Sequence, residues 1–169
     1  MEAVAKGAET RAGHELGDES FMSAADLRAY MAEMEMANAL KEGDALDRAE
    51  KARKELIKTL STPASLEEIK DIVASVQHKV RSAAQRGATE LMVMRFPCAL
   101  CTDKGRAINN ADKDWPDTLT GRPREAYEFW RDHLRPAGYR LKAMIIEWPG
   151  GLPGDVGFFL QWGDAKRRL

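Results

Sequence analysis

The segment from Ser65 to Gly87 constrains the fold most, because it carries the pattern of an amphipathic helix with both ends marked. Ser65 and Glu68 have the spacing of a capping box, in which each side chain bonds the other residue's backbone amide. Gly87 is the residue type that closes a helix in the left-handed conformation. The helix predicted over 66–86 has one apolar stripe, formed by Leu66, Ile69, Ile72, Val73, Val76, Val80 and Ala83. This stripe needs a partner, for which the candidates are a neighbouring helix, a sheet or a second copy of the chain.

Two further helical segments are predicted before this one, over 23–42 and 45–60. Ser23 begins the first, and Asp44 is a good N-cap for the second. The break at Gly43 leaves open two helices or one kinked rod, since a glycine costs a helix only about 1 kcal/mol. The interruption at 61–64 predicts an antiparallel hairpin with the following helix. Residues 21–87 therefore form a helical region, and 1–20 is predicted to be a mobile tail.

The second half of the chain is predicted to hold the main core, because ten of the twelve aromatic residues lie between Phe96 and Trp162. Strands are expected at 91–96, 139–148 and 156–162, and a helix at 123–135. The near-continuous apolarity of the first strand favours a central position.

These elements predict an α+β fold. An N-terminal helical hairpin or arm precedes a small β-α-β-β domain over 88–163 with a three-stranded mixed sheet, and 164–169 is a polar tail. The first two strands are expected to pair in parallel through a right-handed crossover, and the last two to form an antiparallel hairpin. The crossover helix is expected on one face of the sheet, and the helix at 66–86 or another subunit on the other.

Cys98 and Cys101 form a CxxC motif directly after the first strand, and three interpretations are open. A redox thiol site needs a helix N-terminus after the motif, and the following residues begin a helix poorly. A zinc site needs two more ligands, or a symmetric dimer that pools two CxxC pairs. The candidate additional ligands are His133, Asp103 and Asp112. A single CxxC favours the third interpretation, two small residues packed in a turn.

The polar loop 98–118 is the second candidate site, because it leaves the carboxyl end of a strand, where ligand sites in α/β sheets collect. An arginine there suits a carboxylate or phosphate, asparagines suit a polar ligand, and a tryptophan offers a flat wall. The predicted ligand-binding residues are Asp103, Arg106, Asn109, Asn110 and Trp115. The competing interpretation is a surface loop held by its apolar residues, with its charges solvated.

Composition excludes several classes of protein. The net charge of −1 gives no general attraction for nucleic acid or for an anionic membrane. No apolar run approaches the roughly 20 residues of a membrane span. No export signal is visible and only two cysteines occur, so the cytoplasm is the expected location.

The sequence favours a non-catalytic interaction or regulatory module that self-associates, as a homodimer, through its amphipathic helices. These helices carry more apolar surface than a three-stranded sheet covers, and two-fold association is the commonest solution. The methionine-rich helix at 23–42 is also a candidate surface for a protein partner. The alternative is a small-molecule or zinc-binding domain, enzymes included, that uses the loop 98–118. No cofactor other than zinc is suggested.

Overall fold

The computed structural model describes residues 21–164, and the predicted tails at 1–20 and 165–169 lie outside the described residues. The chain divides into two compact units, residues 1–51 and residues 52–169, which are described separately below. Helix α2 (Ala24–Ser61) begins in the first unit and ends in the second. It starts at Ser23, whose hydroxyl oxygen accepts a hydrogen bond from the Asp26 amide at 3.1 Å. The helix is continuous through Gly43, so of the two alternatives, separate helices over 23–42 and 45–60 do not form.

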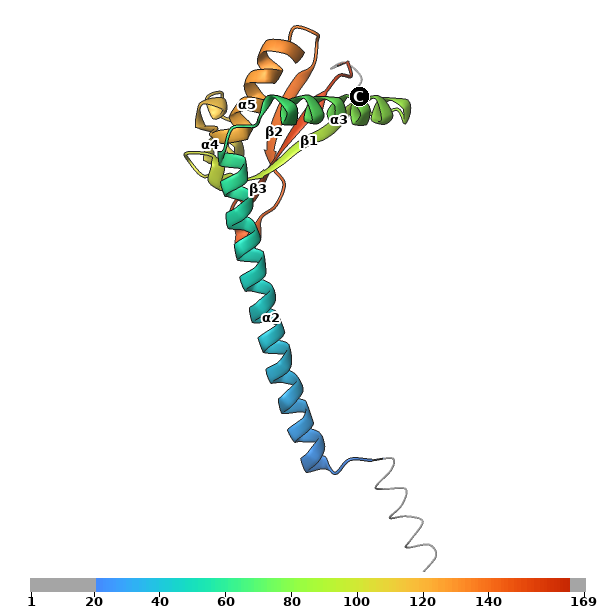
Figure 1. The fold of residues 1–169 in the computed structure, drawn as a ribbon, viewed down its shortest axis with the longest axis vertical. Helices are drawn as coiled ribbons and strands as arrows, with labels where there is room; N and C mark the ends of the chain where they lie inside the picture. Colours follow the sequence, from blue (N-terminus) through green and yellow to red (C-terminus); the bar gives the residue numbers. More distant parts are fainter. Residues whose placement is uncertain (1–20, 165–169) are drawn as a thin grey trace, which may run out of the picture. The chain divides into compact units, whose positions relative to one another are not determined.

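Helix α3 (Leu66–Gln85) begins with the predicted capping box. The Ser65 hydroxyl accepts from the Glu68 amide at 3.2 Å, and the Glu68 carboxylate accepts from the Ser65 amide at 3.2 Å. The predicted hairpin is not confirmed, because α3 runs across the sheet and not back along the end of α2 (Figure 1). Among the residues of α3, Ala83 alone is buried.

The sheet has three strands, β1 (Glu90–Pro97), β2 (Arg140–Ile145) and β3 (Asp155–Gln161). Their order is β1-β3-β2, and both pairings are antiparallel. The predicted hairpin of the last two strands is therefore confirmed. The predicted mixed sheet is wrong: β1 and β2 do not pair, because β3 lies between them.

The central position of β3 follows from its sequence. Val156, Phe158 and Leu160 are all buried on one face. On the other face, a Cβ at Gly157 would press against the side chains of Phe159, Ile146 and Met92, so this position has no room for a side chain. β1 is an edge strand despite its apolarity, and a register shift between Met92 and Met94 interrupts its pairing, as is common at sheet edges.

The connection between β1 and β2 is built from short helices. They are η1 (Cys98–Leu100), α4 (Arg106–Asn109), η2 (Trp115–Thr118), α5 (Gly121–Phe129) and η3 (Trp130–Leu134). The helix predicted at 123–135 is present as α5 and η3, where η3 is a π-helical turn closed by the Arg135 amide on the Trp130 carbonyl at 2.7 Å. A last turn, η4 (Pro149–Gly151), joins β2 to β3. No helix within residues 21–164 is both long enough and apolar enough to span a bilayer.

Candidate functional site

In the loop 98–118, the predicted ligand residue Asp103 stabilises the loop itself. Both Asp103 oxygens accept backbone amides, Oδ1 from Gly105 at 3.0 Å and Oδ2 from Ala107 at 2.7 Å. This carboxylate therefore stabilises the start of α4, and its hydrogen-bonding capacity is largely taken. The buried residues Leu100 and Ile108, with Leu119 directly after the loop, connect it to the main core.

The other predicted ligand residues do not converge. Trp115 packs edge-on against Tyr127, with ring centroids 5.5 Å apart, and also lines a cavity of about 590 Å³. Arg106, Asn109 and Asn110 are exposed, and with Asp103 they line neither this cavity nor the larger one described below. The proposed ligand site on this loop therefore remains a prediction without a cavity shared by its residues.

Cys98 and Cys101 are free and buried. The Cys98 thiol lies 3.2 Å from the Pro153 carbonyl oxygen, to which it donates. Burial raises the pKa of Cys98 above its ordinary value, and burial raises the pKa of Cys101 to about 11, so neither thiol is ionised at neutral pH. Within residues 21–164, no group of three or more His, Cys, Asp or Glu side chains is arranged to hold a metal ion. The predicted additional ligand His133 is exposed, with its ring 4.8 Å from that of Phe129.

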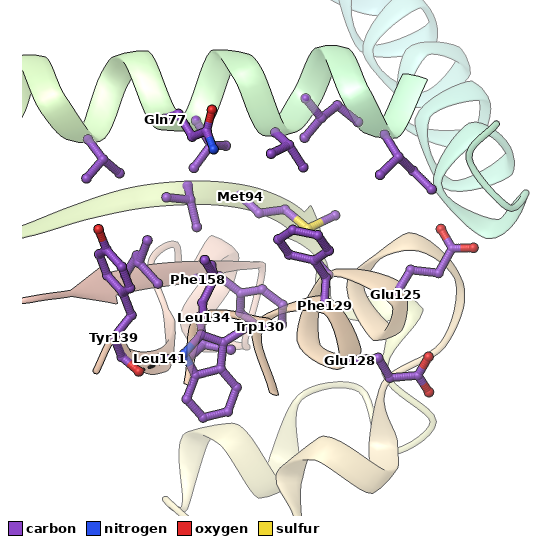
Figure 2. A pocket seen from close by; sticks show the side chains of 18 of the residues that line it. Gln77, Met94, Glu125, Glu128, Phe129, Trp130, Leu134, Tyr139, Leu141 and Phe158 are labelled. Carbon is purple, nitrogen blue, oxygen red and sulfur yellow. Dashed lines mark hydrogen bonds between the residues drawn. The ribbon is translucent and has the colours of Figure 1, made fainter. Parts of the chain in front are cut away.

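An apolar groove of about 920 Å³ lies between α3, α5–η3 and the sheet in the second unit. In Figure 2 the side chains of α3 point across the open space toward Met94, Phe129 and Tyr139. The α3 wall consists of the stripe residues Ile69, Ile72, Val73, Val76 and Val80 with Ala84. The floor is formed by Val93, Met94, Leu141, Phe158 and Leu160. The opposite wall is formed by Ala126, Phe129, Trp130, Leu134 and Tyr139.

The groove shows how the α3 stripe is accommodated. The strand pairs place Met94, Phe158 and Leu160 on the core-facing side of the sheet. Because α3 and α5 line the same groove above these residues, both helices lie over one face of the sheet, and not over opposite faces as expected. The stripe consequently faces the sheet without closing onto it: Ile72 is 49% exposed and Val73, Val76 and Val80 are half-buried.

Helix α3 is held at both ends beside this open middle. At its start, the Arg122 guanidinium donates to the Thr62 carbonyl and to the Glu68 carboxylate, each at 3.0 Å. The Ala64 amide donates to the Glu125 carboxylate at 3.3 Å. At its end, Ala83 is 1% exposed and its carbonyl accepts from the Ala88 amide, just before β1 begins. The fold thus positions α3 from its ends and leaves its central turns free of tight packing.

The wall opposite α3 contains the π-helical turn η3. A π-helical turn is uncommon and is frequently found at functional sites. Here it presents both Trp130 and Leu134 to the groove. The Trp130 indole N–H is satisfied by the Tyr139 carbonyl at 3.1 Å, so the ring is held in place.

Few polar groups interrupt the lining. Arg122, Glu125 and Glu128 all make hydrogen bonds, the last with Arg124 at 3.2 Å. Gln77 and Arg81, one helical turn apart on α3, also line the groove. Within the described part of the chain, no hydrogen bond or ion pair engages the side chain of Gln77 or Arg81.

Sequence reasoning identified one wall of this site and missed the rest. The stripe on α3 was predicted to need a partner: a neighbouring helix, a sheet or a second copy of the chain. In the structure the sheet covers it in part. Gln77 and Arg81 were not predicted, because they lie at the edge of the stripe, where polar residues are common. The interruption of the stripe's edge by two polar residues four apart was the available signal.

The chemistry of the groove is that of a binding site for apolar surface. It has aromatic and aliphatic walls, a fixed frame and a few polar groups at its margin, which are the features of small-molecule sites. The chain matches no protein-family model, and no similar chain was found among curated proteins or among solved structures.

Proposed function

We propose that the protein is a non-catalytic binding module that holds an apolar ligand in the groove between α3 and the sheet. The observation that carries the proposal is that α3 is fixed at both ends while its apolar stripe stays open above an apolar floor. Burying apolar surface is worth about 25 cal/mol per Å², so an open stripe of this kind favours whatever covers it.

The dimensions of the groove suit a small molecule. Ligand sites in proteins commonly measure about 300 to 1,000 Å³ and have mostly apolar linings. The groove, at about 920 Å³, lies at the upper end of that range. The buried thiols of Cys98 and Cys101 lie outside its lining, which agrees with a role in binding and not in covalent chemistry.

Binding of dodecanol, measured by displacement of a fluorescent apolar probe, tests the proposal. Val76→Trp would place a large ring in the middle of the groove and should weaken the affinity by about tenfold or more. Ser75→Trp is the matched control, because Ser75 is exposed on α3 and does not line the groove. It should keep the affinity within about twofold.

Two results would contradict the proposal. One is an absence of dodecanol binding by the folded wild-type protein. The other is a wild-type dimer that dissociates when Val76 is replaced by Trp but not when Ser75 is, since a second copy would then occupy the groove. Circular dichroism of both variants establishes that any lost binding does not come from unfolding.

Self-association through α2 is a second candidate function, and a separate observation favours it. None of the residues of α2 is buried, although the helix carries large apolar side chains. The most exposed region includes Leu27, Tyr30, Met31, Met34, Met36, Leu40 and Leu46. This surface suits a homodimer or another protein partner, and light scattering of the full chain against concentration tests it.

A further inference from the structure

We infer that the ligand of the groove is a single-chain amphiphile with an anionic head, such as a long-chain carboxylate, and that Arg81 and Gln77 bind the head. This inference rests on the proposed function, because it specifies the occupant of the same groove.

The charges at one end of the groove favour an anion. Four charged side chains line it, two basic and two acidic. Arg122 is neutralised by Glu68, Glu128 pairs with Arg124, and Glu125 accepts a backbone amide. Among the described residues that line the groove, Arg81 is the cation without an acidic partner, and the Glu125 carboxylate has no cationic partner. The two charges lie at opposite ends of α3, because Glu125 binds the Ala64 amide before the helix begins and Arg81 lies near its end. A negatively charged group would therefore be compensated at the Arg81 end of the groove.

The geometry around Arg81 suits a head group at the margin and a tail inside. Gln77 and Arg81 are one turn apart, so an amide and a guanidinium face the same side of α3. A guanidinium binds a carboxylate through two parallel hydrogen bonds. The Tyr139 ring lines the same groove, and its hydroxyl has no hydrogen-bond partner within residues 21–164. Below these groups the lining is apolar, through Leu134 and Phe158, where an alkyl chain would lie.

The same observations favour a free amphiphile over a membrane surface. Binding to an anionic bilayer relies on clusters of about four to eight basic residues, each interacting weakly. The groove offers one unpaired cation beside a concave apolar lining. A concave site encloses a single chain, whereas a flat bilayer cannot enter it.

Calorimetric titration of the full chain with dodecanoate and with dodecanol, both below their aggregation concentrations, tests the inference. Wild type should bind dodecanoate about five to ten times more tightly than dodecanol, and added salt should reduce the difference. Arg81→Met should abolish this preference. Lys79→Met removes the same charge from the other side of the stripe, at a residue that does not line the groove, and should keep the preference.

The outcomes separate the two proposals. If wild type binds both compounds equally, or if Lys79→Met and Arg81→Met behave alike, the inferred head-group site is wrong while the apolar groove stands. If neither compound binds, the proposed function itself is wrong. Binding to anionic phosphatidylglycerol vesicles without binding of monomeric dodecanoate would replace the free amphiphile with a membrane surface and overturn the inference.

Discussion

Gly121 occupies a position in the second unit where a side chain does not fit. Its φ is +61°, and a Cβ there would collide with the carbonyl oxygen of Leu60 at the end of α2. Gly121→Ala should therefore lower the free energy of unfolding by about 2 kcal/mol or more, from backbone strain and the collision together. Urea denaturation measures the loss.

Gly87 provides the control for this effect. Its φ is +82°, and an added Cβ would meet no atom within 4 Å. Gly87→Ala should cost only the left-handed conformation, about 1 kcal/mol. Equal losses for the two variants would show that close packing between α5 and α2 contributes nothing.

Cys101 predicts a specific pH dependence of stability. Burial raises its pKa to about 11 from an ordinary value of 9.0, so the folded protein keeps a proton that the unfolded chain loses first. The stabilisation is complete below about pH 9 and is lost as the pH rises through about 11. Wild type should therefore lose more stability between about pH 8 and pH 11 than Cys101→Ala, measured as the shift of the urea midpoint. An identical shift in both proteins would contradict the burial of this thiol.

For single residues of the loop, the sequence did not show whether a side chain binds a ligand or stabilises the fold. The polarity of Asp103 suggested a ligand site, yet an aspartate two residues before a glycine is also a common turn-forming unit. Trp115 was expected to be a wall for a ligand, and it packs between Tyr127 and Phe158. Which of two such roles a side chain takes depends on residues distant in sequence, and no local pattern contains that information.

At the scale of elements, the groove depends on the hydrogen bonds that hold the start of α3 in place. Arg122 donates two hydrogen bonds across the start of α3 and is mostly buried, with a side chain 20% exposed. Arg122→Gln should lower the free energy of unfolding by about 1 to 2 kcal/mol and speed amide hydrogen exchange in residues 62–72.

The neighbouring Arg124 gives the comparison. Its pair with Glu128 is an exposed pair within one helix, of a kind worth about 0.3 to 0.5 kcal/mol. Arg124→Gln should leave hydrogen exchange in α3 unchanged. If both variants raise exchange equally, the start of α3 is not held by Arg122.

Among the helices and strands, sequence patterns predicted correctly those features that depend on neighbouring residues in the chain. The capping box at Ser65 and the strand at 91–96 were predicted and are present, because both depend on neighbouring residues. Strand order failed, because β1 and β3 are both apolar and pairing is decided by which strand packs well on two faces. Gly157 permits that close packing in β3, and its signal in the sequence was a single glycine. The groove could not be foreseen, since it depends on how far α3 stands from the sheet.

For the molecule as a whole, α2 is the element that leaves its apolar side chains exposed. A helix with no buried residue gains little from packing, and isolated helices are marginal in water. At 100° per residue, Leu27, Tyr30, Met31 and Met34 share one side of α2, while Met36 lies on the opposite side. Met34 is 42% exposed and Met36 69%. If α2 pairs with a second copy of itself, the side with Met34 is the better candidate, because it gathers four large apolar residues.

The same change, methionine to glutamate, can therefore be made on opposite sides of α2 and its effects compared. Met34→Glu should convert a self-associated wild type into a monomer, since it places a charge among apolar side chains that association would bury. Met36→Glu makes the identical change on the other side and should leave association unaltered. Sedimentation velocity at several concentrations gives the mass in each case. A wild type that is monomeric throughout excludes self-association, and dissociation by Met36→Glu alone would assign the interface to the opposite side of α2.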